Sequence, residues 1–74
     1  MANLRINETP EQEIQSWTKL EALLVCSDII NKNNDDKQCI EFKKQLESIN
    51  GMKQTDWQEI ALHLLLRQFS GELK

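Results

Sequence analysis

The segment at residues 55–69, TDWQEIALHLLLRQF, constrains the fold more than any other part of the chain. At about 100° per residue, its charged residues and its histidine fall within one narrow arc, and large apolar side chains occupy almost all of the remainder. The later half of residues 10–31 has the same character, because only Glu21, Ser27 and Asp28 interrupt the apolar residues of LEALLVCSDII. A helix that is apolar on nearly all sides has to be buried. The chain therefore predicts two helices that both need extensive cover.

Start and stop signals divide the chain into three predicted helices, at about 10–31, 37–50 and 56–70. Each start has a side chain that can accept a hydrogen bond from the first turn of its helix. In chain order these are Thr9, followed by Pro10 and Gln12, then Asp35 or Asp36, then Thr55 with Gln58. The stops are INKNN, the Asn50–Gly51 pair and the Ser70–Gly71 pair. The middle helix has a single apolar stripe and is expected to lie outermost.

Strands are not expected, because apolar residues do not alternate with polar ones and no hairpin turn lies between β-branched runs. A chain of 74 residues holds at most one domain, close to the size at which a single core is only just sufficient. We therefore predict one all-α domain, 1–74, made of three helices. Residues 1–8 are expected to form a flexible N-terminal segment.

The first and third predicted helices carry more apolar surface than a three-helix chain buries, since each helix of a small bundle needs only about three inward positions per heptad. The surplus predicts a further packing partner, either a second copy of the chain or another protein. We expect a homodimer, formed through the third helix and the end of the first. The residues expected in self-association or partner binding are Trp57, Leu62, Leu65, Leu66, Phe69, Leu23, Ile30 and Trp17. For both tryptophans a core position is the favoured alternative.

Two cysteines bracket an acid- and amide-rich stretch, CSDIINKNNDDKQC at residues 26–39, which raises the question of a metal site or a disulfide. If the second helix folds back along the first, the cysteines are offset by about one helical turn, roughly 5 Å along the axis. That offset and the spacing between helices place their Cα atoms beyond the reach of a disulfide. No register of the stretch fits an EF-hand, and two distant cysteines with one histidine do not make a zinc site. We expect two buried free thiols.

His63 is the sole histidine and the first candidate for catalysis. It lies one turn from Glu59 and one turn from Arg67 in the predicted helix, an arrangement typical of a solvated surface row. The chain has only two glycines, so no glycine-rich phosphate loop is expected. We predict no enzyme activity, no cofactor and no metal.

The net charge of −3 comes from acids and bases that are interspersed along the chain, so no basic surface for nucleic acid is predicted. The first residues, MANLRINETPEQE, lack the apolar run of an export signal, and no apolar run approaches the length of a membrane span. These features lead us to expect a cytoplasmic protein that has neither nucleic acid nor a membrane as its partner.

Protein binding is the function class that remains. We expect a small acidic adaptor, regulator or inhibitor that occupies the surface of a larger protein, as accessory proteins of phages and other mobile elements do. The alternative is a dimeric DNA-binding transcriptional regulator of the helix-turn-helix type, with Gly51 in the turn. That alternative puts Glu47 where a small residue has to let the helices approach. Its recognition face is also not basic, although phosphate contacts from Lys and Arg dominate affinity for DNA.

Overall fold

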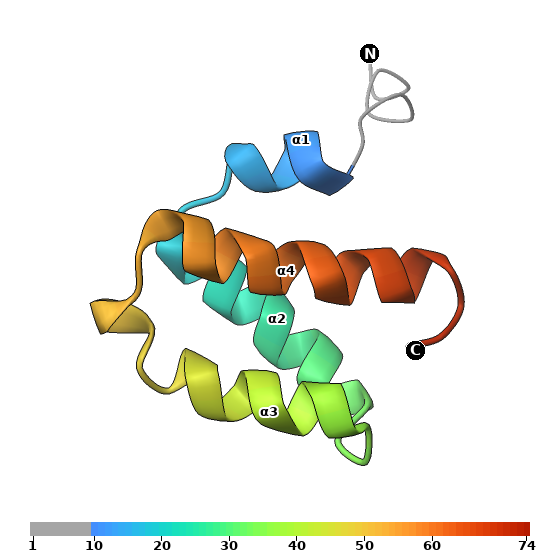
Figure 1. Ribbon diagram of the computed structural model, residues 1–74. Helices are drawn as coiled ribbons and strands as arrows, with labels where there is room; N and C mark the ends of the chain where they lie inside the picture. The colour runs from blue at the N-terminus through green and yellow to red at the C-terminus, as the bar shows by residue number, and fades with distance from the viewer. Residues whose placement is uncertain (1–9) are drawn as a thin grey trace.

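The computed structural model describes residues 10–74, and all regular secondary structure in this range is helical (Figure 1). The elements in chain order are α1 (Pro10–Gln15), α2 (Lys19–Lys32), α3 (Lys37–Leu46), the 3₁₀ turn η2 (Ile49–Gly51) and α4 (Gln54–Phe69). The prediction of an all-α fold is confirmed. The predicted cap Thr9 and the predicted flexible segment 1–8 lie outside the described residues.

Helix α4 lies in the middle of the arrangement, with α1 along one side and α3 along the other (Figure 1). Helix α2 crosses behind α4, from the end of α1 toward the start of α3. The packing of α4 is mainly against α2 and α1, and only light against α3. The Cα atoms extend over 37 × 27 × 15 Å, and the thinnest dimension accommodates two layers of helix axes about 8–10 Å apart. Each helix therefore keeps one face on the surface.

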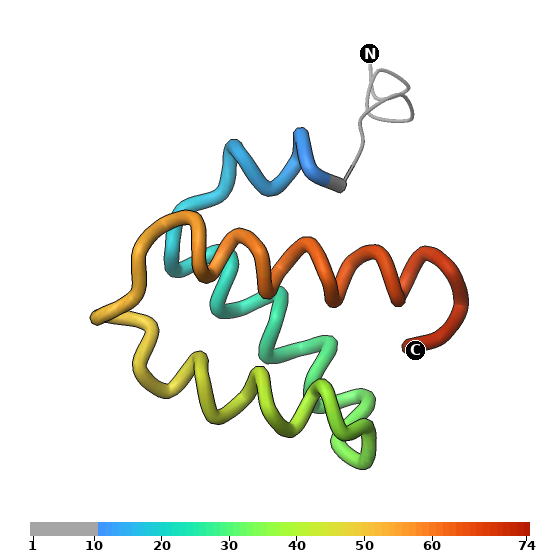
Figure 2. Tube along the Cα trace, in the orientation of Figure 1, coloured from blue at the N-terminus to red at the C-terminus, as the bar shows by residue number. Residues whose placement is uncertain are grey.

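The predicted single helix at 10–31 is wrong, because the chain leaves the helical path between Gln15 and Lys19 (Figure 2). Thr18 has an extended backbone conformation, and its hydroxyl accepts a hydrogen bond from the Glu21 N–H at 3.1 Å. The Glu21 carboxylate accepts one from the Thr18 N–H at 2.9 Å, which completes a capping box. The start of α2 thus satisfies its own first donors, and α1 turns to lie along α4.

The second predicted helix is present but shorter. Asp36 is its cap, and the Asp36 carboxylate accepts a hydrogen bond from the Cys39 N–H at 3.1 Å. Helix α3 ends at Leu46 rather than at residue 50. The Asn50–Gly51 signal falls in η2, a tighter turn that follows the helix.

The third predicted helix starts earlier than expected, at Gln54 rather than at residue 56. Thr55, the predicted cap, lies inside the first turn of α4. The side chain that closes this helix start is Asp56, whose carboxylate accepts a hydrogen bond from the Lys53 N–H at 3.3 Å. A carboxylate in the first turn of a helix also interacts favourably with the positive end of the helix dipole.

The predicted stop of α4 is confirmed. Gly71 has a φ of 88°, in the left-handed region that glycine adopts without strain. The Glu72 N–H donates to the Arg67 carbonyl at 2.9 Å and the Gly71 N–H donates to the Gln68 carbonyl at 3.2 Å, the two bonds of a Schellman motif. The turn sends the chain back over the body of the protein, so that Leu73 is buried.

Asn33 connects this C-terminal turn to the end of α2. Its side chain is buried, its Nδ2 donates to the Ile29 carbonyl at 2.8 Å, and its Oδ1 accepts from the Lys74 N–H at 2.9 Å. A buried amide with both ends bonded fixes the position of two chain segments at once.

One core joins the four α-helices of residues 10–74, η2 and the C-terminal turn. Its buried apolar residues are Ile14, Ala22, Cys26, Ile29, Ile30, Cys39, Leu46, Ile49, Trp57, Ile60, Ala61, Leu64, Leu65 and Leu73. Helix α4 contributes more of them than any other element, as its apolar character in the sequence requires.

Arg67 links α4 to the start of α3 and to the C-terminal turn. Its Nη1 and Nη2 donate to the two carboxylate oxygens of Asp36 at 2.8 and 2.9 Å. Its Nη1 also donates to Gln38 at 2.9 Å, and its Nε donates to Glu72 at 3.1 Å. We call Arg67, Asp36, Gln38 and Glu72 the Arg67 network. The Arg67 and Cys39 hydrogen bonds hold the pKa of the Asp36 carboxyl well below its usual range.

Replacement of Thr18 by alanine tests the capping box. Thr18→Ala is expected to lower the free energy of unfolding by about 1 kcal/mol, because the Glu21 N–H loses its acceptor. The control is Thr55→Ala, which removes an exposed threonine that caps nothing and is expected to change this free energy by less than about 0.5 kcal/mol. Urea denaturation followed by far-UV circular dichroism measures both changes. Equal losses in the two variants would contradict the assignment of the cap to Thr18.

The Arg67 network predicts a loss of stability in acid. Because the pKa of Asp36 is lower in the folded chain than its unfolded value of about 3.9, the contribution of this carboxylate is complete above that value and is lost as the pH falls below it. The urea midpoint of the wild type should therefore fall more steeply between about pH 5 and pH 3 than that of Asp36→Asn. Asp35→Asn removes the neighbouring charge and should keep the wild-type slope. Parallel slopes for wild type and Asp36→Asn would sink the prediction.

Candidate functional site

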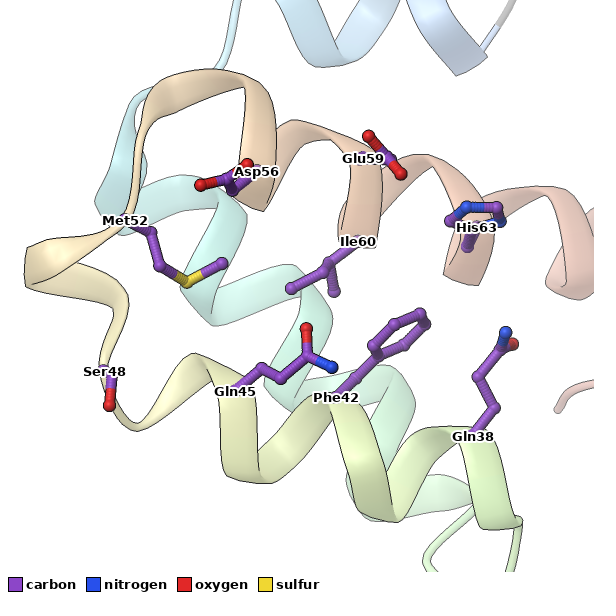
Figure 3. A pocket seen from close by; sticks show the side chains of 9 residues that line it. All are labelled: Gln38, Phe42, Gln45, Ser48, Met52, Asp56, Glu59, Ile60 and His63. Atoms are coloured by element: carbon purple, nitrogen blue, oxygen red, sulfur yellow. The ribbon is translucent and has the colours of Figure 1, made fainter.

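An open groove of about 680 Å³ lies between α3 and α4 (Figure 3). The two helices are joined by residues 47–53 at one end and by the Arg67–Asp36 ion pair at the other, and they pack lightly in between. The residues that line the groove are Gln38, Phe42 and Gln45 of α3, Ser48 and Met52 of the connection, and Asp56, Glu59, Ile60 and His63 of α4. We call this the α3–α4 groove.

The α3–α4 groove has an apolar floor and an acidic rim. Ile60 is buried and Phe42 is half-buried, and the His63 ring lies over Phe42 with centroids 6.2 Å apart and an interplanar angle of 28°. The lining includes the carboxylates of Asp56 and Glu59 but no lysine and no arginine. Both acids are exposed to solvent in the free protein.

The predicted surface row of Glu59, His63 and Arg67 divides between two environments. Glu59 and His63 line the α3–α4 groove, where His63 contacts Phe42. Arg67 belongs to the Arg67 network instead, and its side chain is 26% exposed. Helical spacing alone predicted the row correctly as neighbours, but only the tertiary structure shows that Asp36 engages the arginine.

Both cysteines are buried and free, as predicted. Burial raises the pKa of the Cys26 thiol to about 12. Burial, and then the negative charge of Asp36, raise the pKa of the Cys39 thiol. A thiol in such surroundings stays protonated near neutral pH, and the protonated form is a poor nucleophile and a poor metal ligand.

Thiol labelling tests this placement. In the native protein at about pH 8, Cys26 and Cys39 are expected to react with an aromatic disulfide reagent far more slowly than a free thiol of ordinary pKa near 8.5. In denaturing urea both thiols should react at once. Rapid labelling of either cysteine in the native chain, with an unchanged circular dichroism spectrum, would contradict the burial described above.

Residues 10–74 contain no group of three or more His, Cys, Asp or Glu side chains that is placed to hold a metal ion. Over the same part of the chain, no helix combines the length and the apolar character needed to cross a membrane.

Two leucines on the outer face of α2 are largely exposed. Leu20 is 65% exposed and Leu24 is 63% exposed. They lie four residues apart and therefore share one side of the helix. That side is opposite Ala22 and Cys26, which are both 1% exposed and face the core.

A second groove, of about 450 Å³, lies between α2 and α3. Its apolar lining residues are Leu23, Ile30, Leu46 and Ile49. Its polar lining residues are Ser27, Asn31, Lys43 of α3, and Glu47 and Asn50 of the connection that follows α3. Leu23 is three residues from Leu20 and adjacent to Leu24 along α2, so the two exposed leucines lie beside this groove. We call Leu20, Leu24 and this groove the α2 face.

The eight residues predicted for self-association or partner binding differ in their exposure. Buried in the core are Trp57, Leu65 and Ile30; partly buried and packed against the core are Trp17, Leu23 and Leu62; exposed on α4 are Leu66 and Phe69. Trp57 thus occupies the core position that was its alternative. The exposed members, Leu66 at 48% and Phe69 at 64%, lie near the C-terminal end of α4.

Leu20 and Leu24 were not among the predicted residues. The sequence does carry a signal for them, because Ala22 and Cys26 are small residues spaced by four, and small residues mark the side of a helix that another helix approaches closely. The side opposite Ala22 and Cys26 contains Leu20 and Leu24. A single helix over 10–31 that is apolar on nearly all sides has no distinct outer side. That prediction therefore did not identify Leu20 and Leu24 as exposed.

No protein-family model, no curated protein and no solved structure matches the chain.

Proposed function

We propose that the protein is a small binding module that docks a larger protein through the α2 face. The observation that carries the proposal is the exposure of Leu20 and Leu24 beside an apolar groove. Single exposed leucines are ordinary on protein surfaces, whereas two exposed leucines on one side of a helix, next to a concave groove, favour an interaction site.

The energetics of the α2 face suit this role. Removal of each leucine from water on binding stabilises a complex by about 1–2 kcal/mol, since roughly two thirds of each side chain is still exposed in the free protein. Leu23, Ile30, Leu46 and Ile49 shape the groove beside them and are already packed against the core or part of it. A groove walled by core-packed side chains, next to two exposed leucines, suits a partner helix or loop that inserts apolar side chains.

Self-association is a separate proposal and belongs to α4. We propose that a second copy of the chain packs on the surface of Leu66 and Phe69, the exposed members of the set predicted from the sequence. Neither residue lines the α2 face, so the same protein can form a dimer and still bind a partner.

No observation favours the alternative of DNA binding. The connection between α3 and α4 covers residues 47–53 and includes η2, whereas a helix-turn-helix uses a turn of about 3–4 residues. The α3–α4 groove separates the two helices, and its rim is acidic.

Two pairs of substitutions test the proposals against each other. Leu20→Glu with Leu24→Glu should weaken partner binding at least about tenfold, because two charges replace the apolar anchors. Leu66→Glu with Phe69→Glu replaces two similarly exposed apolar side chains on α4 and should leave partner binding unchanged. The partner is first identified by a photo-crosslinking residue at position 24 in the cells that make the protein, and is then purified for calorimetric titration with each variant.

Light scattering over a concentration series gives the state of association of the same variants. The α4 pair should abolish any dimer, and the α2 pair should leave it intact. Circular dichroism confirms that each variant is folded. Wild-type affinity of the α2 pair for the crosslinked protein would overturn the assignment of docking to the α2 face.

A further inference from the structure

We propose that the α3–α4 groove binds an arginine side chain of a partner protein. This site is distinct from the α2 face, with which it shares no lining residue, and the inference goes beyond the docking function proposed above. The occupant is identified by three properties of the groove: the sign of its charge, the apolar floor, and the hydrogen-bond acceptors on both walls.

The charge of the groove selects a cation. Asp56 and Glu59 lie on the α4 wall, three residues apart, and the groove lining contains no lysine or arginine to neutralise them. The nearest arginine along α4 is Arg67, which reaches the end of the groove through its hydrogen bond to Gln38 at 2.9 Å. Its charge is already paired with Asp36 at 2.8 Å and with Glu72 at 3.1 Å. The charge of Arg67 is therefore neutralised within its own network, and the groove remains negative.

The floor of the groove selects a cation that carries an apolar stem and a flat head. Ile60 and Phe42 lie between the two walls, and the Phe42 ring is directed into the groove (Figure 3). An arginine side chain can lay its methylene groups over such a floor while its guanidinium stacks on an aromatic ring. The apolar side chains of the floor contribute nothing to binding a bare metal ion. Within residues 10–74, no group of three or more His, Cys, Asp or Glu side chains is arranged to hold a metal ion.

The α3 wall supplies a neutral acceptor opposite the acids. Gln38 and Gln45 both project into the groove from α3 (Figure 3). The Gln38 Oε1 already accepts from Arg67 Nη1 at 2.9 Å, so the acceptor for a ligand on this wall is the Gln45 amide oxygen. The guanidinium has five N–H donors in a fixed plane, so it can donate to a carboxylate of α4 and to an amide oxygen of α3 together. A lysine ammonium is more strongly hydrated and has no planar face to stack on Phe42.

A titration with a small arginine probe tests the site without knowledge of the partner. The probe is N-acetyl-arginine methylamide, and its matched control is N-acetyl-citrulline methylamide, which has nearly the same shape but no charge. The arginine probe should cause saturable shifts of backbone amide NMR signals at Phe42, Glu59 and His63. The citrulline probe should cause none.

Matched variants locate the interaction. Glu59→Gln should weaken binding of the arginine probe by about three- to fivefold, which corresponds to the loss of one exposed charge pair. Glu47→Gln removes the same charge from the α2 face and should leave the probe affinity unchanged. Addition of Asp56→Asn to Glu59→Gln should remove saturable binding. The amide that Asp56→Asn introduces can still accept the hydrogen bond from the Lys53 N–H, so the start of α4 keeps its cap.

Three results would overturn the proposal: shifts dispersed over the whole surface, equal shifts with the citrulline probe, or equal weakening by Glu47→Gln and Glu59→Gln. The Leu20→Glu, Leu24→Glu variant should bind the arginine probe as the wild type does. Failure of the α2 face to dock a partner and failure of the groove to bind arginine are therefore separate outcomes.

Discussion

The wide apolar arc of α4 is the constraint on which the rest of the structure depends. Trp57, Ile60, Ala61, Leu64 and Leu65 are all buried, and they occupy more of the helix circumference than one neighbouring helix can cover. Helix α2 covers part of the arc and α1 covers another part. A straight helix over 10–31 would have a single direction and would leave one side of α4 in water. Because the chain breaks between α1 and α2, these two helices run in different directions and cover different parts of the apolar arc of α4.

The packing of α1 and α2 on the apolar arc of α4 also explains the α3–α4 groove. With α1 and α2 in place, α3 packs mainly on α2 and contacts α4 only lightly. At one end the ion pair of Arg67 and Asp36 is bidentate and partly shielded from water, which is the geometry in which such pairs are strongest. Asp36 also caps α3, so one carboxylate both starts this helix and fixes it to α4. Between the two ends the contact of Phe42 with His63 leaves an open groove.

The sequence was sufficient for the fold class and for most helix ends, because caps and stops depend on neighbours within one turn. Gly71 and the all-helical pattern are examples. The break at Thr18 was written in the sequence as TKLE, a capping box. Thr9 and Pro10 offer an earlier start for the same apolar run, and this earlier start masks the signal at Thr18. The α3–α4 groove and the engagement of Arg67 by Asp36 were beyond sequence reasoning, since they join residues 31 positions apart through a packing angle that no local pattern sets.

Helix α3 forms a wall of both candidate sites. Phe42 and Gln45 line the α3–α4 groove, whereas their immediate neighbours Lys43 and Leu46 line the groove beside α2. Consecutive residues of a helix point about 100° apart, so a single helix can present different chemistry to its two sides. A partner that reached over α3 would meet an apolar surface on one side, which favours burial, and an acidic one on the other, which favours a particular charge and orientation. The two grooves together would then select a partner by the spacing between its apolar and its cationic side chains, a property that neither groove can select alone.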